Sequence, residues 1–267
     1  MSDSQQPIAV AAFFDIDNTI MRGASIYHLA RGLFSRKILK PTDLANYAVA
    51  QGKYLISGSE NMQDISRIRD NALAFAKGRT VDEMNALCED IYDEIMADKV
   101  WPGTVQLAHT HRDAGHAVWL VSAAPIELAN IIATKLGLTG AIGTVSEIRH
   151  GKYTGKLKTV PMHGPEKATA IRELASEHGI DLQHSFAYSD SSNDIPLLES
   201  VGNPIAINPD GNLRTYALEH KWPIHDFRRE RLVRRYAVPA GATALALIGA
   251  GAGLMIASRR NKKSGQS

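Results

Sequence analysis

The sequence predicts an α/β fold in which a Rossmann-like parallel sheet is flanked by helices, with a helical insertion after the first strand and a hydrophobic helix at the C-terminal end. Three observations lead to this prediction. Short apolar runs alternate with helical segments along the body of the chain. Residues 25–99 have helical spacing without a strand pattern. Residues 236–258 form an uncharged run as long as a bilayer crossing.

Composition sets the first limits on function. The chain has 267 residues, of which 44% are hydrophobic and 22% are charged, so it can bury a sizeable core. These values exclude wholesale disorder and a polytopic membrane protein. The single cysteine, Cys88, excludes an internal disulfide and suggests no zinc cage, which suits a reducing interior.

Charge is distributed unevenly along the chain. Residues 228–263 contain nine basic side chains and one acidic side chain, a net charge of +8, whereas the whole chain carries +2. Residues 1–227 therefore carry −6, from 21 basic and 27 acidic side chains. Because no basic stripe runs along this part, the sequence argues against nucleic acid as a partner.

The first predicted strand, residues 8–14 (IAVAAFF), is continuously apolar, as expected for a central strand buried on both faces. The insertion that follows contains about four helices, with breaks at 40–43, 57–59 and 77–80. Thr80 and Glu83 have the spacing of a capping box, which predicts that a helix starts there and runs toward Met96.

The second half of the chain predicts alternating strands and helices, which is typical of a parallel sheet. The predicted strands are 117–121, 142–146, 185–189 and 205–208, and the predicted helices are 104–115, 126–136 and 166–178. Residues 148–157 predict a hairpin that turns at His150 and Gly151. These elements predict an α/β core from 1–24 and 100–227, an inserted helical cap at 25–99 and a tail at 228–267.

Three of the predicted strands end on polar side chains: Asp15 after the first, Ser122 after the second and Asp190 after a later one. Ligands of open α/β sheets bind at the carboxyl ends of the strands. Lys167 lies in the first turn of its predicted helix, from which an ammonium group can reach the same edge. The sequence therefore predicts a functional site at this edge of the sheet.

The segment 15–19 (DIDNT) resembles the DxDxT signature of the haloacid dehalogenase-like phosphatases. Ser122, Lys167 and the segment 189–194 (SDSSND) resemble the second, third and fourth motifs of that family, in the same order. The resemblance covers residues 8 to about 227. The helical insertion between the first and second motifs is similar to the cap of the phosphoserine phosphatase-like subgroup.

The resemblance implies an Mg²⁺-dependent phosphomonoester hydrolase that works through an aspartyl-phosphate. Asp15 would be the nucleophile and Asp17 the general acid and base. The implied metal site uses the side chains of Asp15 and Asp190 and the backbone carbonyl of Asp17, with Asp194 orienting a metal-bound water. The implied substrate-binding residues are Thr19, Ser122, Ala123, Lys167 and Asn193.

The sequence does not identify the substrate, because it differs from the phosphoserine phosphatase-like subgroup at a substrate-binding position. Phosphoserine phosphatases have a glutamate nine residues after the nucleophile to hold the substrate amine, and this chain has Ala24 there. A phosphorylated small molecule and a lipid or lipid-precursor phosphate are therefore both candidates. A phosphotransferase would use the same residues. A non-catalytic, membrane-tethered binding module is the alternative from another class.

Residues 236–258 predict a membrane tail with basic residues on both sides, and the sequence predicts a catalytic part on the cytoplasmic side. Gly249 and Gly253 have the spacing of small residues that lets two membrane helices associate. Residues 1–7 do not have the pattern of a signal peptide. His109 and His111 lie in a predicted surface helix without matching carboxylates, which favours a structural over a metal-binding role.

Overall fold

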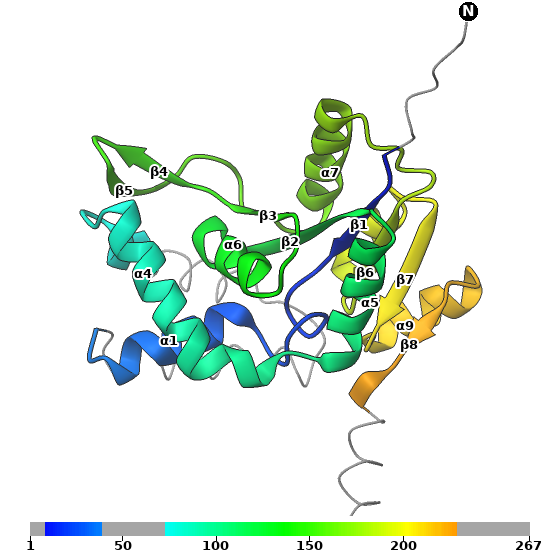
Figure 1. Ribbon diagram of the computed structural model, residues 1–267, viewed down its shortest axis with the longest axis horizontal. Helices are drawn as coiled ribbons and strands as arrows, with labels where there is room; N and C mark the ends of the chain where they lie inside the picture. The colour runs from blue at the N-terminus through cyan, green and yellow to red at the C-terminus, as the bar shows by residue number, and fades with distance from the viewer. Residues whose placement is uncertain (1–8, 39–72, 229–267) are drawn as a thin grey trace, which may run out of the picture. The chain divides into compact units, whose positions relative to one another are not determined.

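The computed structural model describes residues 9–38 and 73–228 (Figure 1). The chain divides into two compact units between His225 and Asp226. All elements described below belong to the first unit.

A six-stranded sheet with the order β3-β2-β1-β6-β7-β8 forms the centre of this unit. Every adjacent pair of these strands is parallel, which confirms the predicted α/β class. The strands are β1 (Ala11–Phe14), β2 (Ala117–Pro125), β3 (Gly140–Thr144), β6 (Phe186–Ser189), β7 (Asn203–Ile207) and β8 (Ile224–His225). Since β1 lies between β2 and β6, residues that follow β1 lie at the middle of the sheet edge.

A separate antiparallel hairpin consists of β4 (Ser146–Arg149) and β5 (Lys152–Leu157). The turn is at His150 and Gly151, as the sequence predicts. Both residues have positive φ angles, 51° and 75°, which the tight two-residue turns of hairpins require. In Figure 1 the hairpin lies beside the start of α4, at the left of the view.

The α-helices of the described ranges lie around the sheet or, in the case of α1 (Ser25–Ser35) and α4 (Val81–Ile91), in the predicted cap (Figure 1). The others are α5 (Pro102–Asp113), α6 (Ile126–Lys135), α7 (Pro165–His178), α8 (Ile195–Leu198) and α9 (Gly211–Glu219). A π-helix (Tyr92–Met96) and a 3-10 helix (Ala97–Lys99) follow α4, and a second 3-10 helix (Ser192–Asp194) precedes α8. The sequence did not predict α8, α9 or β8, which are short or only weakly amphipathic.

Within the described parts of the predicted cap, 25–38 and 73–99, the named elements are all helical. Thr80 and Glu83 form the predicted capping box at the start of α4, each side chain bonding to the other residue's backbone N–H. The predicted breaks at 40–43 and 57–59 lie outside the described residues.

The two aromatic residues of β1 contribute to opposite faces of the sheet. Phe13 belongs to a buried cluster with Ile171 of α7 and Leu197 of α8. The ring of Phe14 stacks on that of Tyr188, with centroids 4.1 Å apart. Both phenylalanines are fully buried, and burial of each ring contributes about 2–3 kcal/mol. This packing fixes the end of β1, where the predicted site begins.

No helix in the described ranges is long and apolar enough to cross a membrane. The predicted membrane segment, 236–258, lies outside those ranges, as do Gly249 and Gly253 with their predicted self-association.

Candidate active site

The centre of the predicted site is a buried ion pair network at the carboxyl edge of the sheet. Lys167, in the first turn of α7, places its Nζ 2.6 Å from Oδ1 of Asp15 and 2.8 Å from Oδ2 of Asp194. These three residues are 4%, 4% and 2% exposed. The fold therefore brings together the first, third and fourth sequence motifs around one ammonium group.

Asp17 lies two residues beyond Asp15, where β1 has ended, and is partly buried. Its Oδ1 accepts a hydrogen bond of 2.8 Å from the backbone N–H of Ser25, the first residue of α1. A carboxylate at a helix N-terminus is stabilised by the unpaired N–H groups there. The start of the insertion thus holds the predicted acid in place.

The fourth motif follows β6. Asp190 comes directly after the strand and is 7% exposed, while Asp194 ends the 3-10 helix that precedes α8. The hydroxyl of Ser189 donates to Oδ2 of Asp194 at 2.7 Å, the same oxygen that binds Lys167. Asp194 therefore orients the lysine. The sequence predicted a different role for Asp194, the orientation of a metal-bound water, and did not predict this contact with Lys167.

The four remaining predicted residues lie outside the ion pair network of Lys167, Asp15 and Asp194. Strand β2 runs three residues beyond Ser122 instead of ending there as predicted, so Ser122 lies inside the strand, and its side chain is buried. The Oγ of Ser122 accepts a hydrogen bond from the N–H of Ala124. Ala123 is exposed, Thr19 is fully buried and Asn193 is half-buried. Among the described residues the Thr19 hydroxyl has no hydrogen-bond partner.

Burial is the main influence on the pKa values of three of the carboxyl groups in the site, Asp15, Asp17 and Asp190. Burial raises the pKa of Asp15 to about 7, against the attraction of Lys167 and with the repulsion of Asp194 and Asp17. Burial, together with the neighbouring carboxylates, also raises the pKa of Asp190 well above its ordinary value. The pKa of Asp17 is raised by burial, although the hydrogen bonds from Ser25 oppose this.

The pKa of Lys167 is raised. Burial alone would lower it, but the carboxylates of Asp15 and Asp194 outweigh that effect. The lysine therefore stays charged. With all four carboxylates ionised (Asp15, Asp17, Asp190 and Asp194), the site would carry a local charge of −3 beside the one ammonium, so burial favours protonation of some of them or the binding of a divalent cation.

The donor set of the site suits Mg²⁺, because all of its ligand candidates are oxygens. Among the described residues, no three His, Cys, Asp or Glu side chains gather as metal ligands. The predicted set contains only two such side chains, Asp15 and Asp190, and takes its third protein ligand from the backbone of Asp17. The residues present therefore fit a cation that keeps several waters.

Sequence reasoning missed several supporting contacts. Asp210 caps α9 and accepts the N–H of Ser192 at 2.8 Å, which holds the fourth motif against the end of β7. Asn208 donates to the backbone carbonyl of Asn18. His28 of α1 is 6% exposed and binds the carbonyl of Arg22 at 2.7 Å. The position of Asp210, two residues after the end of the last predicted strand, was the available signal.

The rings of His109 and His111 form hydrogen bonds with other parts of the fold, in agreement with a structural role. The ring of His109 contacts the carbonyl of Leu136 at 2.9 Å. His111, in the same helix α5, is half-buried. Nδ1 of His111 lies 2.9 Å from Nδ1 of His116, and Nε2 of His111 lies 2.6 Å from the hydroxyl oxygen of Tyr188.

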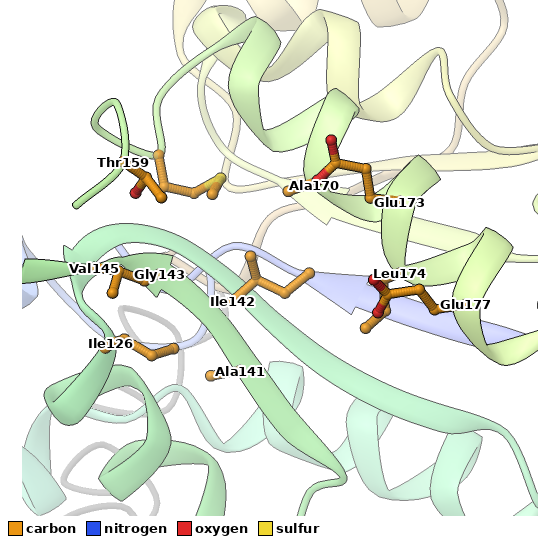
Figure 2. Close-up of a pocket in the computed structure, with 11 residues that line it drawn as sticks. Ile126, Ala141, Ile142, Gly143, Val145, Thr159, Ala170, Glu173, Leu174 and Glu177 are labelled. Atoms are coloured by element: carbon orange, nitrogen blue, oxygen red, sulfur yellow. The ribbon is translucent and has the colours of Figure 1, made fainter.

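A groove of about 300 Å³ lies between the edge of the sheet at β3 and helix α7 (Figure 2). Ile142 and Val145 line one side of it, and Glu173 and Glu177 of α7 line the other. None of the predicted site residues lines this groove. It is therefore distinct from the carboxylate and lysine cluster.

Comparisons with known proteins agree with the geometry. The model of the family described as haloacid dehalogenase-like hydrolase matches residues 12–199. A Mycobacterium tuberculosis protein named phosphoserine phosphatase SerB1 is 49% identical over 265 residues, which cover 98% of this chain and 85% of that protein. A Neisseria meningitidis protein named histidinol-phosphatase is 28% identical and covers 81% of this chain and 98% of its own length.

A solved structure from Bordetella pertussis, of a protein described as having unknown function, superposes with a TM-score of 0.71. It is 26% identical and covers 82% of this chain and 99% of its own length. The arrangement of sheet and helices is therefore shared with a solved structure over most of this chain.

Proposed function

The chain belongs to the haloacid dehalogenase-like hydrolase family, and we propose on that basis that it hydrolyses phosphate monoesters with Mg²⁺ through an aspartyl-phosphate formed on Asp15. The observation that carries this proposal is the buried Lys167 ammonium held between Asp15 and Asp194. A dianionic phosphate can approach a carboxylate only where positive charge offsets the repulsion. Lys167 supplies such a charge beside the nucleophile.

The first half of the reaction uses the side chains in fixed roles. Oδ1 of Asp15 is hydrogen-bonded to Lys167, so we assign the attack on phosphorus to Oδ2. Asp17, held by the N–H of Ser25, donates its proton to the leaving oxygen. Its raised pKa suits an acid that must carry a proton near neutral pH.

In the second half, Asp17 takes a proton from the water that attacks the aspartyl-phosphate, which returns both aspartates to their starting state. Ser122, the N–H of Ala123, Thr19 and Asn193 are proposed to bind the phosphate oxygens. A bound Mg²⁺ would offset phosphate charge through Asp15, Asp190 and the carbonyl of Asp17.

Asp17→Asn tests the assignment of the acid and base. This variant retains the nucleophile, so it should still form the phosphoenzyme, slowly, and break it down more slowly still, with turnover reduced about 10²- to 10⁴-fold. Acid quenching with a radiolabelled substrate measures the bound phosphate. Wild-type breakdown kinetics in this variant would remove Asp17 from the mechanism.

For the substrate, we propose a phosphate ester of a small amino alcohol as the first candidate. Serine and histidinol, the alcohols in the names of the two relatives, both carry an amine beside the phosphorylated hydroxyl. The N-cap of α1 is Ala24, which offers no carboxylate to such an amine. This absence favours the second candidate, a lipid or lipid-precursor phosphate.

A phosphate-release screen of the full chain with Mg²⁺ distinguishes the two candidates. Its arms are phosphoserine, histidinol phosphate, sugar phosphates, nucleotides and detergent-dispersed phosphatidic acid, with Asp15→Asn as the matched control. We expect release from at least one amino-alcohol or lipid phosphate. Release no greater than that of Asp15→Asn in every arm would contradict the phosphatase proposal, and would revive the non-catalytic binding module.

We also propose the domain division and the membrane tail. The core is 1–24 and 100–227, the cap is 25–99, and residues 228–267 attach the catalytic part to the cytoplasmic face of a membrane. The uncharged run at 236–258 supports the tail. The alignment with the mycobacterial relative spans 98% of this chain, so it includes the tail region.

Membrane fractionation tests the tail. The full chain should stay with membranes in about 1 M salt, where the Debye length is about 3 Å, and in carbonate. A chain that ends at Phe227 should leave the membrane fraction and keep its activity on a water-soluble substrate. Release of the full chain by salt alone would instead indicate a surface contact through the basic flanks.

A further inference from the structure

We propose that the β4–β5 hairpin is a second membrane contact, which rests on an anionic bilayer and orients the catalytic unit. The name basic hairpin is used for residues 146–160. The proposal goes beyond the phosphatase chemistry and the tail, and it rests on the charge, exposure and anchoring of this segment.

The net charge of the basic hairpin is opposite in sign to that of the rest of residues 1–227. The basic hairpin contains four cations and one acid, a net charge of +3, whereas residues 1–227 together carry −6, so the rest of that range carries −9. All four cations are exposed: Arg149, Lys152, Lys156 and Lys158. A compact positive segment on a negative body is attracted to anionic surfaces and points this side of the unit toward them.

The same segment exposes apolar side chains. Three large hydrophobic side chains are exposed among the described residues, and two of them, Ile148 (42%) and Val160 (64%), belong to the basic hairpin. Aliphatic side chains beside cations are the composition of segments that lie at the headgroup and acyl-chain boundary. Charge and apolar exposure therefore coincide on one segment.

Folding alone does not account for the cations. Arg149 and Lys152 are direct cross-strand partners, and like charges in that position destabilise a hairpin. Glu147 offsets part of this charge, because it binds both Arg149 and Thr154. The remaining excess of positive charge suits an external anion.

The basic hairpin is firmly attached to the catalytic unit. The Tyr153 N–H and carbonyl bond to the backbone of Arg79 and Gly78, and Thr80 forms a bridge with Lys152. Tyr153 itself is 3% exposed, and its hydroxyl donates to Glu127 of α6 at 2.6 Å. A contact between the hairpin and a bilayer would therefore fix the orientation of the whole unit.

The occupant to which we commit is a bilayer that contains anionic lipid. The exposed side chains of the segment are cationic and aliphatic, apart from His150 and Thr159, and its one tyrosine, Tyr153, is buried. Single-stranded nucleic acid is usually bound by stacking on exposed aromatic rings such as Phe, Tyr and Trp. The proposed tail would already hold the chain at a membrane, which raises the local concentration of lipid headgroups around the hairpin.

Depth-dependent fluorescence quenching tests the contact. The full chain, purified in detergent, carries an environment-sensitive dye at Ile148→Cys or, as the matched control, at Leu218→Cys of α9. Leu218 is also exposed (66%), and α9 and the hairpin lie at opposite sides of Figure 1. The native Cys88 is 1% exposed and burial raises the pKa of its thiol to about 12, so it should not react with the dye.

Each labelled chain is incorporated into vesicles of phosphatidylcholine alone or with roughly 30% phosphatidylglycerol, with spin-labelled lipids as quenchers. In the anionic vesicles we expect quenching at position 148 to exceed that at 218 by at least ~3-fold. Lys152→Gln with Lys156→Gln should abolish the difference, whereas Arg112→Gln with Lys221→Gln, an equal change of charge elsewhere, should not. Activity on a soluble substrate should be unchanged in both pairs.

Equal quenching at the two positions in anionic vesicles would overturn the proposal, as would loss of the difference in the control pair. If the chain binds neutral vesicles but position 148 is not quenched in anionic ones, the tail survives and the hairpin contact fails. If the chain binds only anionic vesicles and position 148 is quenched, the hairpin contact stands and the inserted tail fails.

Discussion

Two buried polar clusters are built on the same two strands, and they differ in charge. The carboxylate cluster consists of Lys167 with Asp15, Asp17, Asp190 and Asp194, at the end of β1 and β6. The histidine cluster consists of Phe14, His111, His116 and Tyr188, beside the same strands. Phe14 directly precedes Asp15, and Tyr188 lies two residues before Asp190.

In the histidine cluster every contact can be made between neutral groups. Tyr188 can donate to Nε2 of His111, whose Nδ1–H then donates to Nδ1 of His116. Burial, together with His116, lowers the pKa of His111 to about 4, and burial raises the pKa of Tyr188 to about 12. In the carboxylate cluster, four acids share one ammonium. One cluster therefore stabilises the fold, while the other holds unbalanced charge that suits the binding of a cation and a phosphate.

The largest expected effect that separates the clusters is that of Asp15→Asn. Turnover should fall at least ~10⁴-fold, because the amide is a poor nucleophile and a weak magnesium ligand. The free energy of unfolding without Mg²⁺ should be unchanged or higher, since the variant removes one of several mutually repelling carboxylates. Phosphate release and urea denaturation measure the two quantities. A large loss of stability would show that Asp15 is held mainly for the fold.

Lys167→Met should have the opposite effect on stability. It leaves the buried carboxylates of Asp15 and Asp194 without their counter-ion, which we expect to cost about 3–5 kcal/mol. Lys135→Met is the matched control, because Lys135 pairs with Glu89 and Asp93 near the surface and should lose less than about 1 kcal/mol. Equal losses in urea denaturation would contradict the difference between buried and exposed pairs.

The two clusters should also respond to pH in opposite directions. The pKa of His111 is lower in the folded state than its ordinary 6.5, so its contribution to stability is complete above about pH 6.5 and is lost as the pH falls toward 4. A pKa change from 6.5 to about 4 corresponds to at most about 3.4 kcal/mol, and solvent screening of the half-exposed ring reduces the expected loss to the order of 2 kcal/mol. The pKa of Asp15 is raised to about 7, so its contribution is present at low pH and is lost as the pH rises through 7.

Denaturation without Mg²⁺ from pH 4 to 8, in wild type, His111→Phe and Asp15→Asn, separates these contributions. His111→Phe should flatten the acidic limb, and Asp15→Asn should flatten the limb near neutral pH. If both limbs persist in both variants, other groups control the pH dependence of stability.

The smallest expected effect is that of Tyr188→Phe. It removes one hydrogen bond to His111 while the ring can still stack on Phe14, so the protein should lose about 1 kcal/mol of stability. The kcat should be within twofold of wild type, because the hydroxyl bonds to His111, which is not one of the proposed site residues. A large loss of activity would show that the two clusters are coupled through β6.

Local patterns were enough to predict most elements. The apolar run before Asp15, the capping box of Thr80 and Glu83 and the turn at His150 and Gly151 each depend on residues close in sequence. Periodicity and turn chemistry therefore encode them directly. The short elements α8 and β8 were missed, because a few residues give too little periodicity to be recognised.

By itself, the sequence determined which residues lie at the carboxyl edge of the sheet, since Asp15 and Asp190 follow predicted strands and Lys167 lies in the first turn of a predicted helix. Only the tertiary structure decided which of them touch. Lys167 lies 152 residues from Asp15 and 27 from Asp194, and His111 lies 77 residues from its partner Tyr188. Such pairs are set by the order of the strands and the packing of α5 and α7, which depend on the whole core and not on any local pattern of residues.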